Sequence, residues 1–107
     1  MHVAQESPDQ PDVIALIAEL DAYQDTLYPA EARYALDLES LKQPNVVFAV
    51  ARDAQGVAIG CGAVVVSGAM GELKRMYVRP GSRRAGAAQK LLGELEAAAA
   101  QRGCQEL

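Results

Sequence analysis

The segment from Glu72 to Leu92 constrains the fold more than any other part of this 107-residue chain. An apolar strand runs into a turn at Pro80-Gly81, which is followed by a basic loop of small residues and then by an amphipathic helix. The first N–H groups of a helix have no intrahelical partner, and the helix dipole adds partial positive charge there. The small side chains at 85–88 would let a phosphate reach these N–H groups, while Arg83 and Arg84 add full charge. The segment therefore predicts a pyrophosphate site at the start of a helix.

The net charge of −4 conceals a strong contrast along the chain. Residues 1–71 contain three basic and ten acidic side chains, whereas residues 72–90 contain six basic side chains and one acidic one. A single basic patch on an acidic protein suits a small polyanion. Nucleic-acid binders are usually basic overall and interleave aromatic side chains, and only 5% of this chain is aromatic. No nucleic-acid partner is therefore expected, and a solvated basic loop without a ligand is the simpler alternative.

The composition indicates one globular domain, since half of the residues are apolar and 22% are charged. Residues 1–9 lack the basic and apolar regions of a secretory signal. The apolar run 57–66 is too short to cross a bilayer as a helix, so no membrane partner is expected. Cys61 and Cys104 are far apart and His2 is the only histidine, so the sequence predicts core thiols in a cytoplasmic protein and no metal site.

Hydrophobic periodicity and turn residues divide the chain into strands and helices. The first helix is predicted to begin near Pro11, because proline is favoured at the first helical position. The predicted elements are strand 2–6, helices 11–23 and 30–41, strands 46–52, 57–66 and 70–78, helix 84–102, and the first residues of another strand at 104–107. The buried stripe of the last helix is predicted to be Ala88, Leu91, Leu92, Leu95 and Ala99.

The segment 72–92 resembles the acetyl-CoA-binding motif of the GNAT-type N-acetyltransferases. In that family an Arg or Gln, two spacers, a Gly, one spacer and a Gly or Ala follow a strand that ends in a valine. Arg83, Gly86 and Ala88 match these positions after Val78. The order of strands and helices is also that of the family, so the resemblance covers most of the chain. It implies an α+β fold with a mixed sheet, in which the last helix and the closing hairpin of the GNAT fold are missing.

The resemblance further implies a single, C-terminally truncated domain over residues 1–107. In the family a fifth strand, a fourth helix and a closing hairpin usually follow, and that helix carries a tyrosine that serves as general acid. A sheet without its fifth strand leaves an edge strand bare, and bare edges tend to pair with another chain. A homodimer through the exposed sheet edge is therefore expected.

The resemblance also assigns cofactor residues. It implies that acetyl-CoA binds to the backbone of Met76 and Val78, where the motif strand of the family splays from its neighbour, usually at a bulge. The phosphate-binding loop is predicted to comprise Arg83, Arg84, Ala85, Gly86, Ala87 and Ala88. Arg75 and Arg79 are predicted to face solvent or the adenosine end of the cofactor.

Glu72 lies where several members of the family place a catalytic glutamate. Strand alternation puts Glu72 on the same face as Met76, which the resemblance places near the thioester. Glu72 is therefore a candidate general base, and a surface glutamate paired with a neighbouring cation such as Lys74 is the equal alternative. Leu27 and Tyr28 lie in the linker between the first two helices, which in the family forms one wall of the acceptor pocket.

Two functions are compatible with these residues. The first is an N-acetyltransferase that transfers acetyl from acetyl-CoA to a primary amine, either a small amine or a peptide amine. The second is a non-catalytic remnant of the fold that binds CoA or serves as an interaction module. The motif favours the first function, and the missing C-terminal third of the fold favours the second.

Overall fold

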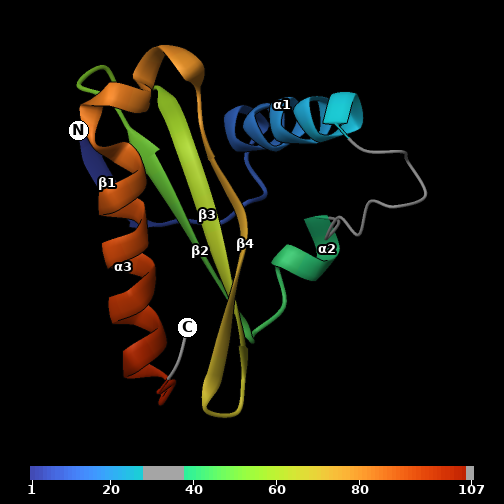
Figure 1. The fold of residues 1–107 in the computed structure, drawn as a ribbon, viewed down its shortest axis with the longest axis vertical. Helices are drawn as coiled ribbons and strands as arrows, with labels where there is room; N and C mark the ends of the chain where they lie inside the picture. The colour runs from blue at the N-terminus through green and yellow to red at the C-terminus, as the bar shows by residue number, and fades with distance from the viewer. Residues whose placement is uncertain (28–37, 106–107) are drawn as a thin grey trace.

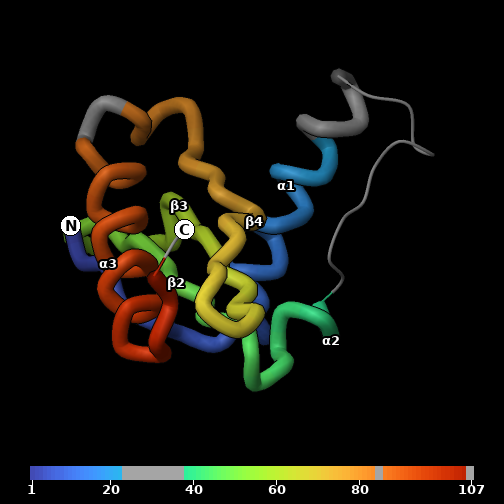
Figure 2. Tube along the Cα trace, turned by 60° about the horizontal axis from the view of Figure 1, so that its bottom comes forward, coloured from blue at the N-terminus to red at the C-terminus, as the bar shows by residue number. Residues whose placement is uncertain are grey.

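The computed structural model describes residues 1–27 and 38–105, in which four antiparallel strands form one sheet in the order β1-β2-β3-β4 (Figure 1). The elements are β1 (His2–Gln5), α1 (Pro11–Leu27), α2 (Leu38–Leu41), β2 (Val46–Arg52), β3 (Ala58–Ser67), β4 (Met70–Val78), the 3-10 helix η2 (Pro80–Ala85) and α3 (Ala87–Gln101). α3 covers one face of the sheet, and α1 and α2 lie on the other (Figure 1 and Figure 2). These layers confirm the predicted fold class.

The first four predicted strands are confirmed to within one residue at each end, and β2 and β4 agree at both ends. The turn between β2 and β3 is fixed by Asp53, whose Oδ1 accepts N–H bonds from Gln55 and Val57 at 2.9 and 3.0 Å. Gly56 in this turn has a φ of +83°, and Gly68 in the next turn has a φ of +61°. Glycine adopts such positive φ values without a steric penalty, so both hairpins are specified locally.

The core between α3 and the sheet is apolar. Leu91 and Leu95 are fully buried, as the periodicity predicted, and pack with Val47, Ala49 and Val64 of the sheet. Burial of a leucine side chain contributes about 1.5–3 kcal/mol. These two side chains therefore supply a large part of the interaction that holds α3 on the sheet.

The start of α3 differs from the prediction. The sequence predicted a helix from Arg84 with Ala88 in its buried stripe. Instead, residues 80–85 form η2, Gly86 adopts a φ of +80°, and α3 begins at Ala87. The buried stripe is rotated as a result, so Ala87 is fully buried and Ala88 is exposed. The prediction was wrong here because a proline opens a separate helical turn and the left-handed glycine interrupts it.

α1 packs on the opposite face of the sheet. It extends to Leu27, whereas the sequence predicted an end near residue 23. Val13 and Leu16 of α1 are fully buried in a cluster that contains Phe48 and Cys61. Burial raises the pKa of the Cys61 thiol to about 12. Cys61 therefore stays a neutral, apolar core residue at physiological pH.

Only part of the second predicted helix falls within the described residues. α2 carries the buried Leu41, while the rest of the predicted helix 30–41, with Ala32 and Leu36, lies outside the described residues. None of the described helices is both long and apolar enough to cross a membrane.

Arg52 joins the N-terminal end of α1 to the sheet. Its guanidinium pairs with Glu6 at 2.8 Å and with Asp12 of α1 at 2.7 Å, and it donates to the Gly56 carbonyl oxygen at 2.9 Å. Hydrogen bonding to Arg52 lowers the pKa of both carboxyl groups. The network fixes the first turn of α1 against the turn between β2 and β3.

The end of the described chain lies beside the start of β4. After α3 the chain turns at Gly103, and the N–H of Gln105 donates to the carbonyl oxygen of Ala69 at 2.7 Å. The predicted strand at 104–107 is not formed at Cys104 and Gln105, and its last two residues lie outside the described residues.

A methyl group at Gly62 would collide with the core under α3. Its Cβ would lie 2.3 Å from Sδ of Met76 and 2.9 Å from Cδ1 of Leu95, which is fully buried and has little room to move. We expect Gly62→Ala to lower the free energy of unfolding in urea by about 1–3 kcal/mol. Gly93→Ala on α3, where a Cβ meets nothing within 4 Å, should raise it by up to about 1 kcal/mol. Unchanged stability in Gly62→Ala would contradict the close approach of α3.

Candidate functional site

β4 contains a bulge near its centre. The register shifts between Cys61 and Ala63 of β3, so that Gly62 lies opposite both Arg75 and Met76. Arg75 has a φ of +58°, a value rarely adopted by residues other than glycine. An extra residue of this kind leaves the ladder and bends its strand. The bulge that the family resemblance implied is therefore present in the motif strand.

The bulge reverses the alternation of side chains along β4. Lys74 pairs with Ala63, which packs in the cluster under α1, whereas Met76 packs in the cluster under α3. Glu72 shares the face of Lys74, because side chains two apart on a regular strand point the same way. The prediction that Glu72 shares a face with Met76 is therefore wrong. The prediction assumed regular alternation of side chains along the whole strand, and the sequence of the strand does not reveal the extra residue of a bulge.

A cleft of about 390 Å³ opens where β4, η2 and α3 meet. Its lining brings together four of the predicted cofactor residues, Met76, Val78, Arg83 and Ala88. Leu20 of α1 and Tyr77 complete the lining, and the sequence did not predict either as a site residue. Leu20 belongs to α1, and no sequence signal placed that helix beside β4. A mostly apolar cleft with a few polar groups is typical of a small-molecule site.

The start of α3 supplies the polar end of this cleft. Gly86 is the N-cap residue, and no side chain caps the first turn. The N–H groups of Ala87, Ala88 and Gln89 therefore have no intrahelical partner, while the N–H of Lys90 donates to the Gly86 carbonyl oxygen at 3.2 Å. A Cβ at Gly86 would meet nothing within 4 Å, so the space beside it is open. Uncapped N–H groups beside open space fit a phosphate group.

Arg83 connects this loop to the end of β4. Its Nε donates to the carbonyl oxygen of Val78 at 3.0 Å, which fixes the guanidinium beside the cleft. A guanidinium carries five N–H donors, so this bond uses one of them. Arg84 and Ala85 contribute backbone to η2, and their side chains lie outside the described part of the structure.

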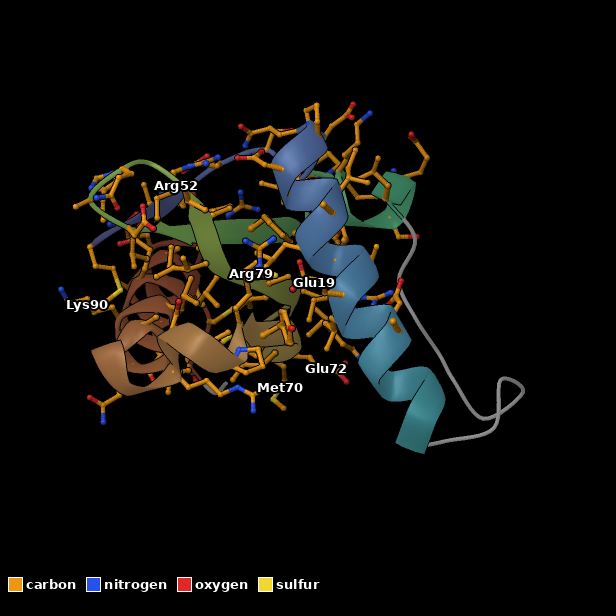
Figure 3. All side chains as sticks on the ribbon, turned by 90° about the horizontal axis from the view of Figure 1, so that it is seen from above. Glu19, Arg52, Met70, Glu72, Arg79 and Lys90 are labelled. Atoms are coloured by element: carbon orange, nitrogen blue, oxygen red, sulfur yellow. The ribbon has the colours of Figure 1, made fainter. Side chains whose placement is uncertain are left out.

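Two ion pairs join α1 to β4 and the residue that follows it. Arg79 pairs with Glu19 at 2.7 Å, and Figure 3 shows these two side chains facing each other between the sheet and the helix. Arg75 pairs with Asp21, and its side chain is 5% exposed. The prediction that Arg75 faces solvent or the adenosine end is therefore wrong, and Arg79 is half-buried. The sequence shows that the first part of the chain is acidic and that residues 72–90 are basic. It does not show which acidic side chain pairs with which basic one.

Tyr77 lies between these two ion pairs along the strand. Its hydroxyl donates to Glu19 Oε1 at 3.3 Å. Burial, followed by the charge of the Glu19 carboxylate and the hydrogen bond to it, raises the pKa of Tyr77. The phenol therefore stays protonated at physiological pH and presents a neutral polar group at the cleft.

Glu72 does not line the cleft. Its side chain is 69% exposed and pairs with Lys74 at 2.8 Å. It borders a separate depression beside the β3–β4 turn, together with Met70 and Leu73. Glu72 pairs with Val65 and Met76 lies opposite Gly62, so the two are three steps of β3 apart, a span of roughly 10 Å. This position agrees with a surface ion pair, and the catalytic role of Glu72 stays a prediction.

The remaining predicted site residues lie at the limit of the described chain. Leu27 ends α1, but its side chain is not described, and Tyr28 lies outside the described residues. Within residues 1–27 and 38–105, no three His, Cys, Asp or Glu side chains gather in a way that could hold a metal ion.

Residues 13–107 match the acetyltransferase (GNAT) family, so the chain belongs to this family. An IAA acetyltransferase of Azospirillum brasilense is 45% identical over 96 residues, which are 88% of this chain and 62% of the relative. The chain thus spans less than two thirds of the length of this relative.

Solved structures share the fold. A protein of Klebsiella pneumoniae subsp. pneumoniae MGH 78578 described as an acyl-CoA N-acyltransferase is 39% identical, with a TM-score of 0.76 over 96% of this chain and 66% of its own. An aminoglycoside 6'-N-acetyltransferase complexed with coenzyme A has a TM-score of 0.77 over 97% of this chain and 58% of its own. Its sequence identity is 20%, so the likeness concerns the fold alone.

The raised pKa of Tyr77 depends partly on Glu19, and we expect Glu19→Gln to lower it. Loss of the nearby negative charge makes the phenolate less unfavourable, so Tyr77 should ionise at a lower pH than in the wild type. A titration followed by NMR of ring-labelled tyrosine, with Tyr77→Phe to assign the signal, measures the shift. Glu39→Gln on α2 is the control and should leave the pKa of Tyr77 unchanged. An unchanged pKa of Tyr77 in Glu19→Gln would show that burial alone raises this pKa.

Proposed function

We propose that this chain carries the acetyl-CoA site of an acetyltransferase that acylates a primary amine, either a small amine or a peptide amine. The observation that supports this most directly is the cleft at the end of β4. Four residues predicted from the family motif line it together, Met76, Val78, Arg83 and Ala88. They come from the strand, the 3-10 helix and the last helix, so their convergence is a property of the fold.

The phosphates of the cofactor fit the start of α3. Uncapped N–H groups and the positive end of the helix dipole favour a negative charge there. Gly86 leaves open space beside these groups, and Arg83 adds a full positive charge at the same end of the cleft. The backbone N–H groups of Ala87 and Ala88 and the Arg83 guanidinium are the groups that we propose to hold the pyrophosphate, with Gly86 leaving the space for it.

The outer edge of β4 fits the pantetheine arm. Among the described residues, β4 is the last strand of the sheet and pairs only with β3. Its outward backbone groups next to the bulge can therefore bond an extended ligand in the manner of an added strand. We propose that Met76 and Val78 bind the arm with their backbone. The homodimer predicted from the same edge stays a prediction.

For the chemistry, a base must take the proton of the attacking amine. Glu72 lies on the α1 face of β4, and Leu27, which was predicted to belong to the wall of the acceptor pocket, ends α1. At roughly 10 Å from Met76 along the strand, its carboxylate would act on the amine through water rather than by direct contact. We propose this role for Glu72.

The position of Glu72 also supports the second candidate, a coenzyme A-binding module without catalysis. An exposed glutamate paired with Lys74 has the geometry of an ordinary surface ion pair. In that case the cleft binds the cofactor and no transfer follows.

Calorimetry with acetyl-CoA tests the cofactor site, and we expect Gly86→Glu to abolish binding. The new carboxylate would occupy the space proposed for the phosphates and repel them. Gly103→Glu is a matched control, because Gly103 also has a positive φ of +90°, also faces open space, and follows the other end of α3. It should bind acetyl-CoA as the wild type does. Equal binding by both variants would place the phosphates elsewhere, and a wild type that binds nothing would reject the proposed site.

Thiol release from acetyl-CoA in the presence of primary amines and short peptides separates the two candidate functions. We expect Glu72→Gln to lower kcat about a hundredfold, within the range for loss of a general base, with KM for acetyl-CoA unchanged. Glu39→Gln removes a comparable exposed and ion-paired glutamate and should have no effect. Full activity in Glu72→Gln would show that another group takes the proton. Absence of transfer by a wild type that binds acetyl-CoA would favour the binding module.

A further inference from the structure

Arg75 adopts a backbone conformation that is unfavourable for its residue type. Among the described residues it is the only non-glycine with a positive φ, at +58°. Such conformations persist where the surrounding contacts hold them, and they cluster at functional sites. The contacts of Arg75 therefore indicate what the strained bulge depends on.

Both the side chain and the carbonyl group of Arg75 are held by neighbours. The guanidinium pairs with Asp21 of α1, and its side chain is 5% exposed. The carbonyl oxygen accepts a hydrogen bond from Sγ of the buried Cys61 at 3.4 Å. Loss of a carboxylate beside a buried guanidinium is costly, because the charge has been taken out of water. Loss of the ion pair with Asp21 should therefore disturb Arg75.

The bulge decides which groups of β4 face the cleft. Gly62 lies opposite both Arg75 and Met76, so β4 carries one residue more than β3 over this stretch. Side chains alternate with a period of two, so regular pairing would move Met76 and Val78 to the opposite face. Both residues line the cleft in the bulged strand.

We propose that Asp21 and Arg75 are positioning residues for acetyl-CoA. Their ion pair holds the bulge, and the bulge holds the backbone of Met76 and Val78 where the pantetheine arm binds. This inference rests on the proposed function. Neither side chain needs to touch the cofactor, since the effect passes through the strand. The phosphate loop belongs to η2 and α3, outside the bulged stretch, and meets β4 only at its last residue, where Arg83 donates to the Val78 carbonyl oxygen. The pair should therefore act mainly on the pantetheine arm and much less on the nucleotide.

Calorimetry with two ligands tests this distinction. The ligands are coenzyme A and adenosine 3′-phosphate 5′-diphosphate, its nucleotide half. We expect Asp21→Asn to weaken coenzyme A binding about tenfold, since misplaced binding groups lose affinity steeply. The affinity for the nucleotide should stay within about twofold. Asp12→Asn is the matched control, because it removes another Asp–Arg pair of the same helix, at 2.7 Å from Arg52 and away from β4. It should leave both affinities unchanged.

Two results would overturn the proposal. Wild-type affinity for coenzyme A in Asp21→Asn would show that the ion pair does not position the strand. An equal loss for both ligands would show a general structural effect in place of a local one.

Two variants of Arg75 test the role of its charge. Arg75→Lys keeps the positive charge and Arg75→Met removes it, so we expect Arg75→Lys to bind coenzyme A more tightly than Arg75→Met does.

Hydrogen exchange without ligand keeps this inference separate from the proposed function. We expect Asp21→Asn to speed exchange at the amides of 75–78 and to leave those of 70–74 and of α3 unchanged. Unchanged exchange at 75–78 would reject the role of the pair in the bulge, whatever the ligands do. If the wild type binds neither ligand, the proposed function fails, and the exchange data still decide whether Asp21 and Arg75 hold the bulge.

Discussion

The bulge in β4 is the feature on which the strand side of the site depends. It introduces one extra residue opposite Gly62, and this single insertion decides that Met76 and Val78 face α3 while Glu72 and Tyr77 face α1. An extra residue in a strand is unfavourable unless neighbouring contacts compensate for the lost ladder. Here the compensation comes from α1, which pairs with Arg75. The cleft is thus built jointly by the sheet and by a helix from the other end of the sequence.

Packing on both faces of the sheet makes this arrangement rigid. On one side Leu91 and Leu95 bury α3 against the sheet, and on the other Val13 and Leu16 bury α1. Gly62 has no side chain, so Met76 and α3 approach β3 closely at the bulge. Because the interior is close-packed, a shift of the whole of β4 would also move both helices, whereas a change confined to the bulge need not. The position of the cleft is therefore coupled to the core as well as to the ion pairs.

The sequence predicted the parts of the fold that are decided locally. Strand β2 is rich in β-branched residues and is followed by the turn at 53–56, and both of its ends were predicted correctly. The exposure of Ala88 was missed, because the switch from a 3-10 helix to α3 depends on the backbone of Gly86. The face of Glu72 and the burial of Arg75 were missed for a related reason. A bulge and its partner on α1 are long-range features, and the alternation of a single segment does not reveal them.

The ion pairs also change the interpretation of the positive charge of residues 72–90. Its basic side chains were read as a patch for a polyanion, yet Lys74, Arg75 and Arg79 pair with carboxylates of the protein itself. Two of these carboxylates belong to the acidic N-terminal part of the chain, so the two oppositely charged segments partly neutralise each other on folding. The groups that would attract a phosphate ligand are then those of the loop before α3, where Arg83 lies close to the uncapped start of the helix. A local donor geometry, rather than the overall charge of the segment, is what would make this site selective for a pyrophosphate.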